Sequence, residues 1–152
     1  MHILVVCAAN RCRSVMAQTI FKQLSENIHL SWTIMSAGTH AEHGLTADPV
    51  TIRVLQRNGY LPDTSQRSKT LQEVMHIPWD LVLVMDHEQR QAVLARYPQL
   101  AARVMVIGRE ACPVIPDPYR QGYDQGLKTL KLLEPMAQYW LGRLVAQQSI
   151  AS

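Results

Sequence analysis

Short, almost continuously apolar runs are the feature that most restricts the fold of this chain. Residues 3–6 (ILVV) and 80–85 (DLVLVM) are typical of strands that are buried on both faces of a sheet. Further strands are predicted at 30–35 and 103–107, and helical spacing follows each strand along the chain. This alternation predicts an α/β fold in which a four-stranded parallel sheet carries helices on both faces.

The helices expected after these strands occupy most of the remaining chain. They are predicted over 14–24, from Asp48-Pro49 to about residue 58, over 70–76, over 88–96 and from about Gln125 onward. Pro135 lies inside the last helical pattern, so a bend or a restart of that helix is expected. No linker, repeat or low-complexity segment divides the 152 residues, which predicts one domain over residues 1–152.

Composition argues against several classes of partner and site. The 15 basic and 12 acidic residues leave a net charge of +3, and no run of Lys or Arg indicates a nucleic-acid partner. No stretch reaches about 18 apolar residues, so membrane insertion is not expected. The six histidines form no metal-ligand pattern, and no metal or other cofactor is expected. An odd number of cysteines, three, favours a reducing, cytoplasmic location.

The stretch CAANRCRS, residues 7–14, lies between the first predicted strand and the first predicted helix. A strand, a tight loop and a helix N-terminus leave free backbone N–H groups, which predicts a phosphate-binding loop. Arg13 can bind two phosphate oxygens, and the same positive field should stabilise Cys7 as a thiolate nucleophile. Ser14 can donate a hydrogen bond to that sulfur, and Asn10 tolerates the left-handed backbone of a curled loop.

A second motif, PDPYR at residues 116–120, contains a candidate proton donor for this chemistry. Transfer of a phosphoryl group to Cys7 expels an alkoxide or a phenoxide, and since even a phenol has a pKa of about 10, a proton donor helps the group to leave. Asp117, on a proline-stiffened loop, would protonate this leaving group and afterwards activate water. By itself Asp-Pro is typical of a turn, but its place after the fourth predicted strand favours the catalytic interpretation.

With three further motifs, the chain resembles the low-molecular-weight protein tyrosine phosphatases along nearly its whole length. The motifs occur in the family's order, at 7–14, 36–39 (SAGT), 47–49 (ADP), 85–86 (MD) and 117–119 (DPY). The resemblance implies Cys7 as nucleophile, Arg13 as phosphate clamp and Asp117 as acid and base. It also implies that the phosphate-binding loop and its supporting hydrogen bonds are formed by Ala8, Ala9, Asn10, Arg11, Cys12, Ser14 and Ser36.

Three positions in and beside the loop depart from the family pattern. Ala9 replaces a usual glycine, so the loop must accommodate a Cβ atom. Arg11 replaces a usual apolar residue and adds charge beside the pocket. Val15 replaces the proline that commonly opens the helix. These three changes leave the expected catalytic residues in place, and they bear on the expected substrate preference.

The expected substrate wall also differs from the family pattern. An aromatic residue is common there, but here the resemblance implies a wall formed by His40, His43 and Tyr119. Tyr119 is followed by Arg120 and not by a second tyrosine. That pattern resembles bacterial members that oppose the tyrosine autokinases of exopolysaccharide export. The expected partner is therefore a tyrosine-phosphorylated protein, such as the tail of an autokinase.

Two other functions use similar residues. Arsenate reduction relays a disulfide through further cysteines, but none lies between Cys12 and Cys112. A non-catalytic phosphotyrosine-binding module would keep Arg13 and could lose Cys7 or Asp117, but both are present. Hydrolysis of phosphotyrosine is therefore the favoured prediction.

Two residues keep alternative interpretations. Cys12 lies five residues from Cys7, so it could trap an oxidised Cys7 as a disulfide or could only pack beneath the helix. Cys112 is a competing partner for such a disulfide. Asp86 could orient Arg13 or could cap the helix that begins beside it.

Overall fold

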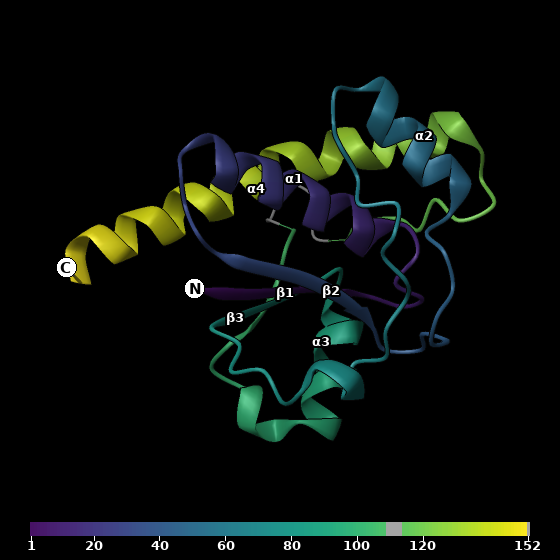
Figure 1. The fold of residues 1–152 in the computed structure, drawn as a ribbon. Coiled ribbons are helices and arrows are strands. Elements are labelled where there is room, and N and C mark those ends of the chain that lie inside the picture. Colours follow the sequence, from purple (N-terminus) through teal and green to yellow (C-terminus); the bar gives the residue numbers. More distant parts are fainter. Residues whose placement is uncertain (109–113, 152) are drawn as a thin grey trace.

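A computed structural model describes residues 1–108 and 114–151, and Cys112 lies outside this part of the chain (Figure 1). Four strands form one sheet: β1 (His2–Cys7), β2 (Thr33–Gly38), β3 (Leu81–Val84) and β4 (Val104–Val106). Their order is β2-β1-β3-β4, and every neighbouring pair is parallel. The predicted four-stranded parallel sheet is confirmed.

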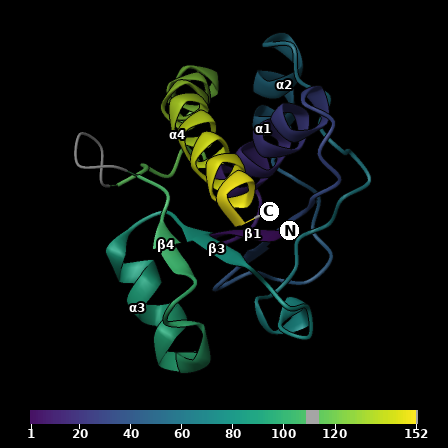
Figure 2. The ribbon, with the colours of Figure 1, turned by 90° about the vertical axis from the view of Figure 1, so that its left-hand side faces the viewer.

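Helices cover both faces of the sheet (Figure 2). One face carries α1 (Arg13–Asn27), α2 (Pro49–Arg57) and α4 (Tyr123–Ala151), and the other carries α3 (His87–Arg96) with the short 3-10 turns η1 (Gln72–Val74) and η2 (Pro98–Leu100). Within the described residues, no helix is long and apolar enough to span a bilayer.

Alternating side chains of β1 place its residues in two separate apolar cores. Ile3 and Val5 pack in the core shared with α1 and α4, whereas Leu4 and Val6 pack in the core that contains Val93 of α3. Burial on both faces explains why this strand has no polar alternation in the sequence.

The second strand lies three residues later than predicted. Its apolar pattern favoured 30–35, but β2 pairs with β1 from His2↔Thr33 to Cys7↔Gly38. The pairing therefore includes Ser36, a fully buried polar residue whose hydroxyl is hydrogen-bonded. Backbone pairing with a neighbour, and not apolar content, sets the end of this strand.

Two helix predictions also need correction. The sequence predicts a bend or a restart at Pro135, but helix α4 is continuous through it, so the restart does not occur. Leu133 and Ala137, on either side of the proline, are fully buried in the same core, and this packing holds the helix together. The helix expected over 70–76 is only the 3-10 turn η1, over Gln72–Val74.

The strands of a parallel sheet end at the same edge, and this places the predicted motifs together. Strand β1 ends at Cys7, β2 at Gly38 and β3 at Val84. The loop between β1 and α1 is held at this edge by Thr39, whose N–H donates to the carbonyl oxygen of Cys7 at 3.0 Å, and by His40, whose N–H donates to that of Ala8 at 2.9 Å.

Candidate active site

The loop between β1 and α1 leaves consecutive backbone N–H groups without acceptors among the described residues. Within the described ranges, no protein group accepts a hydrogen bond from the backbone N–H of residues 9–14. Asn10 has a φ of 57°, the left-handed conformation that the sequence predicted for it. Consecutive free N–H groups at a helix N-terminus form a site for an anion with several oxygens.

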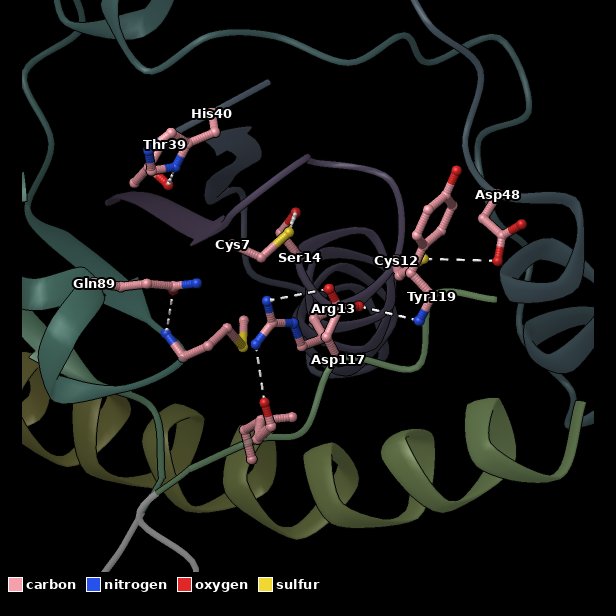
Figure 3. Close-up of polar contacts among 12 residues, drawn as sticks. Cys7, Cys12, Arg13, Ser14, Thr39, His40, Asp48, Gln89, Asp117 and Tyr119 are labelled. Atoms are coloured by element: carbon pink, nitrogen blue, oxygen red, sulfur yellow. Dashed lines mark hydrogen bonds and ion pairs between the residues drawn. The ribbon is translucent and has the colours of Figure 1, made fainter. Parts of the chain in front are cut away.

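The sulfur of Cys7 lies at the base of this loop, 3.0 Å from the hydroxyl oxygen of Ser14 (Figure 3). The side-chain amide of Asn10 donates to that same hydroxyl oxygen at 2.9 Å. Because the oxygen of Ser14 already accepts from Asn10, its own proton is free to be donated to the sulfur. This arrangement makes Ser14 a hydrogen-bond donor to the sulfur of Cys7.

Ser36 anchors Asn10 from the neighbouring strand. Its hydroxyl oxygen accepts from the side-chain amides of Asn10 and Gln66, both at 2.9 Å, and donates to the side-chain oxygen of Gln18 at 2.5 Å. The side-chain oxygen of Asn10 accepts from the backbone N–H of Lys69 at 3.0 Å. The predicted trio of Asn10, Ser14 and Ser36 is therefore brought together by direct hydrogen bonds.

Three residues of this network were not identified from the sequence: Gln18, Gln66 and Lys69. Gln18 lies on the face of α1 that meets β2, while Gln66 and Lys69 come from the segment before η1. The available signal was weak, because Gln and Lys in a polar segment are normally solvated. Only the tertiary fold shows that the side chains of Gln18 and Gln66 bind Ser36 and that the backbone N–H of Lys69 binds Asn10.

Gly38 allows the network to approach the loop closely. A Cβ atom at this position would lie 2.5 Å from the carbonyl oxygen of Ala8 and 3.0 Å from the backbone nitrogen of Asn10. Both distances are shorter than normal contacts, and both partners are backbone atoms that cannot move independently. The glycine in the SAGT motif is thus required by the packing of β2 against the phosphate-binding loop.

Arg13 is buried and held from the loop that follows β4. Its side chain is only 8% exposed, and one terminal nitrogen donates to the carbonyl oxygen of Ile115 at 2.9 Å. The other terminal nitrogen lies 3.8 Å from a carboxylate oxygen of Asp117. The second carboxylate oxygen of Asp117 accepts from the backbone N–H of Tyr119 at 3.1 Å. These contacts place the predicted arginine and the predicted acid beside each other (Figure 3).

Cys12 is a buried neutral thiol at the end of the loop. Its Sγ donates to a carboxylate oxygen of Asp48 at 3.6 Å. Burial raises the pKa of Cys12 to about 12, and the nearby carboxylate of Asp48 acts in the same direction. Asp48 precedes α2 as expected, but its side chain makes no capping hydrogen bond and instead accepts from this thiol.

A small cavity of about 40 Å³ lies above the loop. It is lined by Cys7, Ala9, Arg11, Cys12, Arg13, Asp117 and Tyr119. The residues predicted as nucleophile, phosphate clamp and acid therefore face one volume, and Tyr119 forms part of its wall.

The two histidines expected in the substrate wall are not among the residues that line this cavity. His40 lies with its ring nitrogen 3.0 Å from the hydroxyl of Thr39, and His43 pairs with Glu73 at 2.5 Å. Both belong to the segment after β2, and Figure 3 shows the side chain of His40 beside Thr39. Over the described parts of the chain, no group of three or more potential ligands is arranged to hold a metal ion.

Asp86 caps a helix and does not orient Arg13. Its carboxylate accepts from the backbone N–H of Gln89 at 2.7 Å, at the first turn of α3. The contacts of Arg13 come instead from Ile115 and Asp117. Of the two sequence interpretations of Asp86, the helix cap is the one observed.

Comparisons with known proteins agree with this geometry. The low molecular weight phosphotyrosine protein phosphatase family matches residues 2–150. The probable low molecular weight protein-tyrosine-phosphatase EpsP of Ralstonia nicotianae is 32% identical over 144 residues, which cover 95% of this chain and 96% of that protein.

Two solved structures have the same fold. The tyrosine phosphatase Wzb from Escherichia coli K30, in complex with sulphate, has a TM-score of 0.86 and 30% identity, over 94% of this chain and 97% of that one. A mutant of the YwlE arginine phosphatase with a phosphorylated active-site serine has a TM-score of 0.86 and 26% identity, over 95% of each chain. This chain belongs to the low molecular weight phosphotyrosine protein phosphatase family and is a protein-tyrosine phosphatase.

Proposed function

We propose that this enzyme hydrolyses phosphotyrosine in proteins through a phosphoryl group carried by Cys7. The observation that carries the proposal is the single cavity onto which Cys7, Arg13 and Asp117 converge. The free N–H groups of residues 9–14 and the guanidinium of Arg13 would bind the phosphoryl oxygens. The comparisons with named phosphatases favour hydrolysis over arsenate reduction and over a non-catalytic binding module.

The proposed reaction has two steps. The thiolate of Cys7 attacks phosphorus as the bond to the tyrosine oxygen breaks, and Asp117 gives its proton to that oxygen. Asp117, now a carboxylate, then takes a proton from water, and the water oxygen attacks phosphorus as the bond to sulfur breaks. Ser14 donates a hydrogen bond to the departing thiolate. Phosphate leaves, and Cys7 and Asp117 return to their starting states.

The finer proposal concerns the substrate and the location. We propose that the substrate is a tyrosine-phosphorylated bacterial protein, such as the tail of an exopolysaccharide tyrosine autokinase. The support is the Asp117-Pro118-Tyr119-Arg120 pattern and the similarity to EpsP. A reducing, cytoplasmic location would keep Cys7 unoxidised, as the reaction requires, and the structure places Cys7 in no disulfide with a described residue.

The experiment is hydrolysis of a phosphotyrosine peptide, with matched phosphoserine and phosphoarginine peptides and with arsenate as alternative substrates. We expect turnover of phosphotyrosine, and acid quenching should trap one phosphoryl group on the tryptic peptide that contains Cys7. The Cys7→Ala variant is the control for both signals. Preferential turnover of phosphoarginine or arsenate, or a phosphoryl group trapped elsewhere, would overturn the proposal.

A redox role for Cys12 is proposed on the same loop. Peroxide would oxidise the thiolate of Cys7 to a sulfenic acid, and Cys12 would then displace water to form a disulfide. Both cysteines line the same cavity. Because the pKa of Cys12 is raised to about 12, the fraction of Cys12 that is a thiolate increases with pH throughout the neutral range. The disulfide should therefore form faster at about pH 8.5 than at about pH 6.5, because more of Cys12 is then a thiolate.

The measurement is recovery of activity by dithiothreitol after peroxide, with mass spectrometry of the linked peptides. We expect recovery in the wild type and in Cys112→Ser, and reduced recovery in Cys12→Ser. Full recovery in Cys12→Ser, without a crosslink between residues 7 and 12 in the wild type, would leave Cys12 with a packing role alone.

A further inference from the structure

Two arginines lie against one tyrosine at the mouth of the cavity. The guanidinium carbon of Arg11 is 5.9 Å from the ring centroid of Tyr119, and that of Arg120 is 5.2 Å from the same centroid. Arg11 and Tyr119 line the cavity, and the tyrosine is 38% exposed. An aromatic face attracts cations and so holds both guanidinium groups beside the opening.

The two guanidinium groups retain donors for a further ligand. Arg11 uses its Nε to donate to the carbonyl oxygen of Thr46 at 2.9 Å, and neither of its terminal nitrogens has an acceptor within the described part of the chain. Arg120 is exposed and makes no ion pair with any described residue. Arg13 differs, since each of its terminal nitrogens already contacts a protein oxygen, that of Ile115 or Asp117, and its remaining N–H groups are left for the phosphoryl group.

The nearby carboxylates do not neutralise these two arginines. Asp48 accepts from the thiol of Cys12, and Asp117 contacts Arg13 and the backbone N–H of Tyr119. The mouth of the cavity therefore carries two positive charges beyond the one that contacts the phosphoryl group. A planar guanidinium with free N–H groups binds carboxylate and phosphate oxygens in pairs.

The backbone of Arg120 supplies an independent observation. Its φ of 59° lies in the left-handed region, which favours glycine and asparagine over residues with long side chains. Arg120 is the third residue of a turn in which the N–H of Gln121 donates to the carbonyl oxygen of Pro118 at 2.9 Å. Residues in such a sparsely populated backbone conformation cluster at functional sites, which favours a binding role for the side chain of Arg120.

We infer that Arg11, Tyr119 and Arg120 form a subsite for a second anionic group of the substrate, next to the phosphotyrosine. The inference rests on the proposed phosphotyrosine hydrolysis and adds a substrate class to it. The preferred peptides carry a glutamate, an aspartate or another phosphorylated residue beside the phosphotyrosine. Tyr119 contributes by holding the two guanidinium groups, and the arginines contact the anion.

The test uses three phosphotyrosine peptides that differ only in the flanking residues, which are glutamine, glutamate or phosphoserine. The readout is the ratio of kcat/KM for each anionic peptide to that for the glutamine peptide, measured for every enzyme variant separately. We expect each arginine to contribute about two- to fivefold to the ratio at low salt, and salt to reduce it. Comparison of glutamate with phosphoserine shows which anion the subsite prefers.

The variants are Arg11→Gln, Arg120→Gln and the double replacement. The matched control is Arg96→Gln, because Arg96, the last residue of α3 on the other face of the sheet, has its guanidinium carbon 5.5 Å from the ring centroid of the adjacent Tyr97. We expect the ratio to fall in each single variant, to approach one in the double variant and to persist in Arg96→Gln.

Equal hydrolysis of all three peptides by the wild type at low salt would overturn the subsite, as would a ratio that survives in the double variant. Neither result affects the proposed function, which depends on hydrolysis of the glutamine peptide. Failure to hydrolyse that peptide would instead contradict the proposed function itself.

Discussion

Replacing Arg13 with lysine is expected to lower kcat/KM for aryl phosphates by about 10²-fold or more, although the charge is kept. The guanidinium is positioned by two different contacts, to the carbonyl oxygen of Ile115 and to the carboxylate of Asp117. A lysine ammonium is a single point charge, so it cannot keep these contacts and also bind two phosphoryl oxygens. The measurement is steady-state hydrolysis of p-nitrophenyl phosphate.

Arg90→Lys is the matched control for this prediction. Arg90 also donates to backbone carbonyl oxygens, those of Val104 and Ala101, but it lies on α3 and does not line the cavity. We expect Arg90→Lys to retain most of the activity. A loss in Arg13→Lys no larger than that in Arg90→Lys would remove Arg13 from the phosphate clamp.

Asp117→Asn is expected to lower turnover by about 10²–10⁴, the range associated with loss of a general acid. The loss should grow as the leaving group becomes more basic, because a poor leaving phenoxide depends more on protonation. The carboxylate of Asp117 is half exposed, so the variant should fold normally. The measurement is kcat for a series of aryl phosphates that differ in the pKa of the phenol.

Asp124→Asn serves as the control, because Asp124 is exposed in the first turn of α4 and does not line the cavity. For Asp124→Asn, kcat should stay close to the wild-type value for every aryl phosphate in the series. If Asp117→Asn slowed good and poor leaving groups by the same factor, another group would have to donate the proton.

The parts of the fold and the site that follow from local sequence could be predicted. Buried strands such as β1 and β3 have continuous apolar runs, which identify a parallel sheet without knowledge of distant contacts. The loop from Cys7 to Ser14 is equally local, because one strand, one turn and one helix place its side chains. The left-handed Asn10 follows from the same short segment.

Other features depend on segments that are far apart in the sequence. Gln66 reaches Ser36 across 30 positions, and neither glutamine nor its polar neighbours carry a pattern that indicates burial. The bounds of β2 depend on its pairing with β1. The position of His43 depends on an ion pair with Glu73, which a sequence pattern around the SAGT motif does not contain.

The hydrogen-bond network behind the phosphate-binding loop has a consequence for the end of the reaction. The hydroxyl of Ser36 and the side-chain amide of Asn10 find these partners within the protein, so the hydrogen bonds that shape the loop do not require a bound anion. Because the phosphate-binding loop is already ordered, little of the binding free energy of an oxyanion is lost to ordering the loop. We therefore expect inorganic phosphate to compete with substrate for the same N–H groups, so that added phosphate lowers the fraction of the enzyme that is free to react.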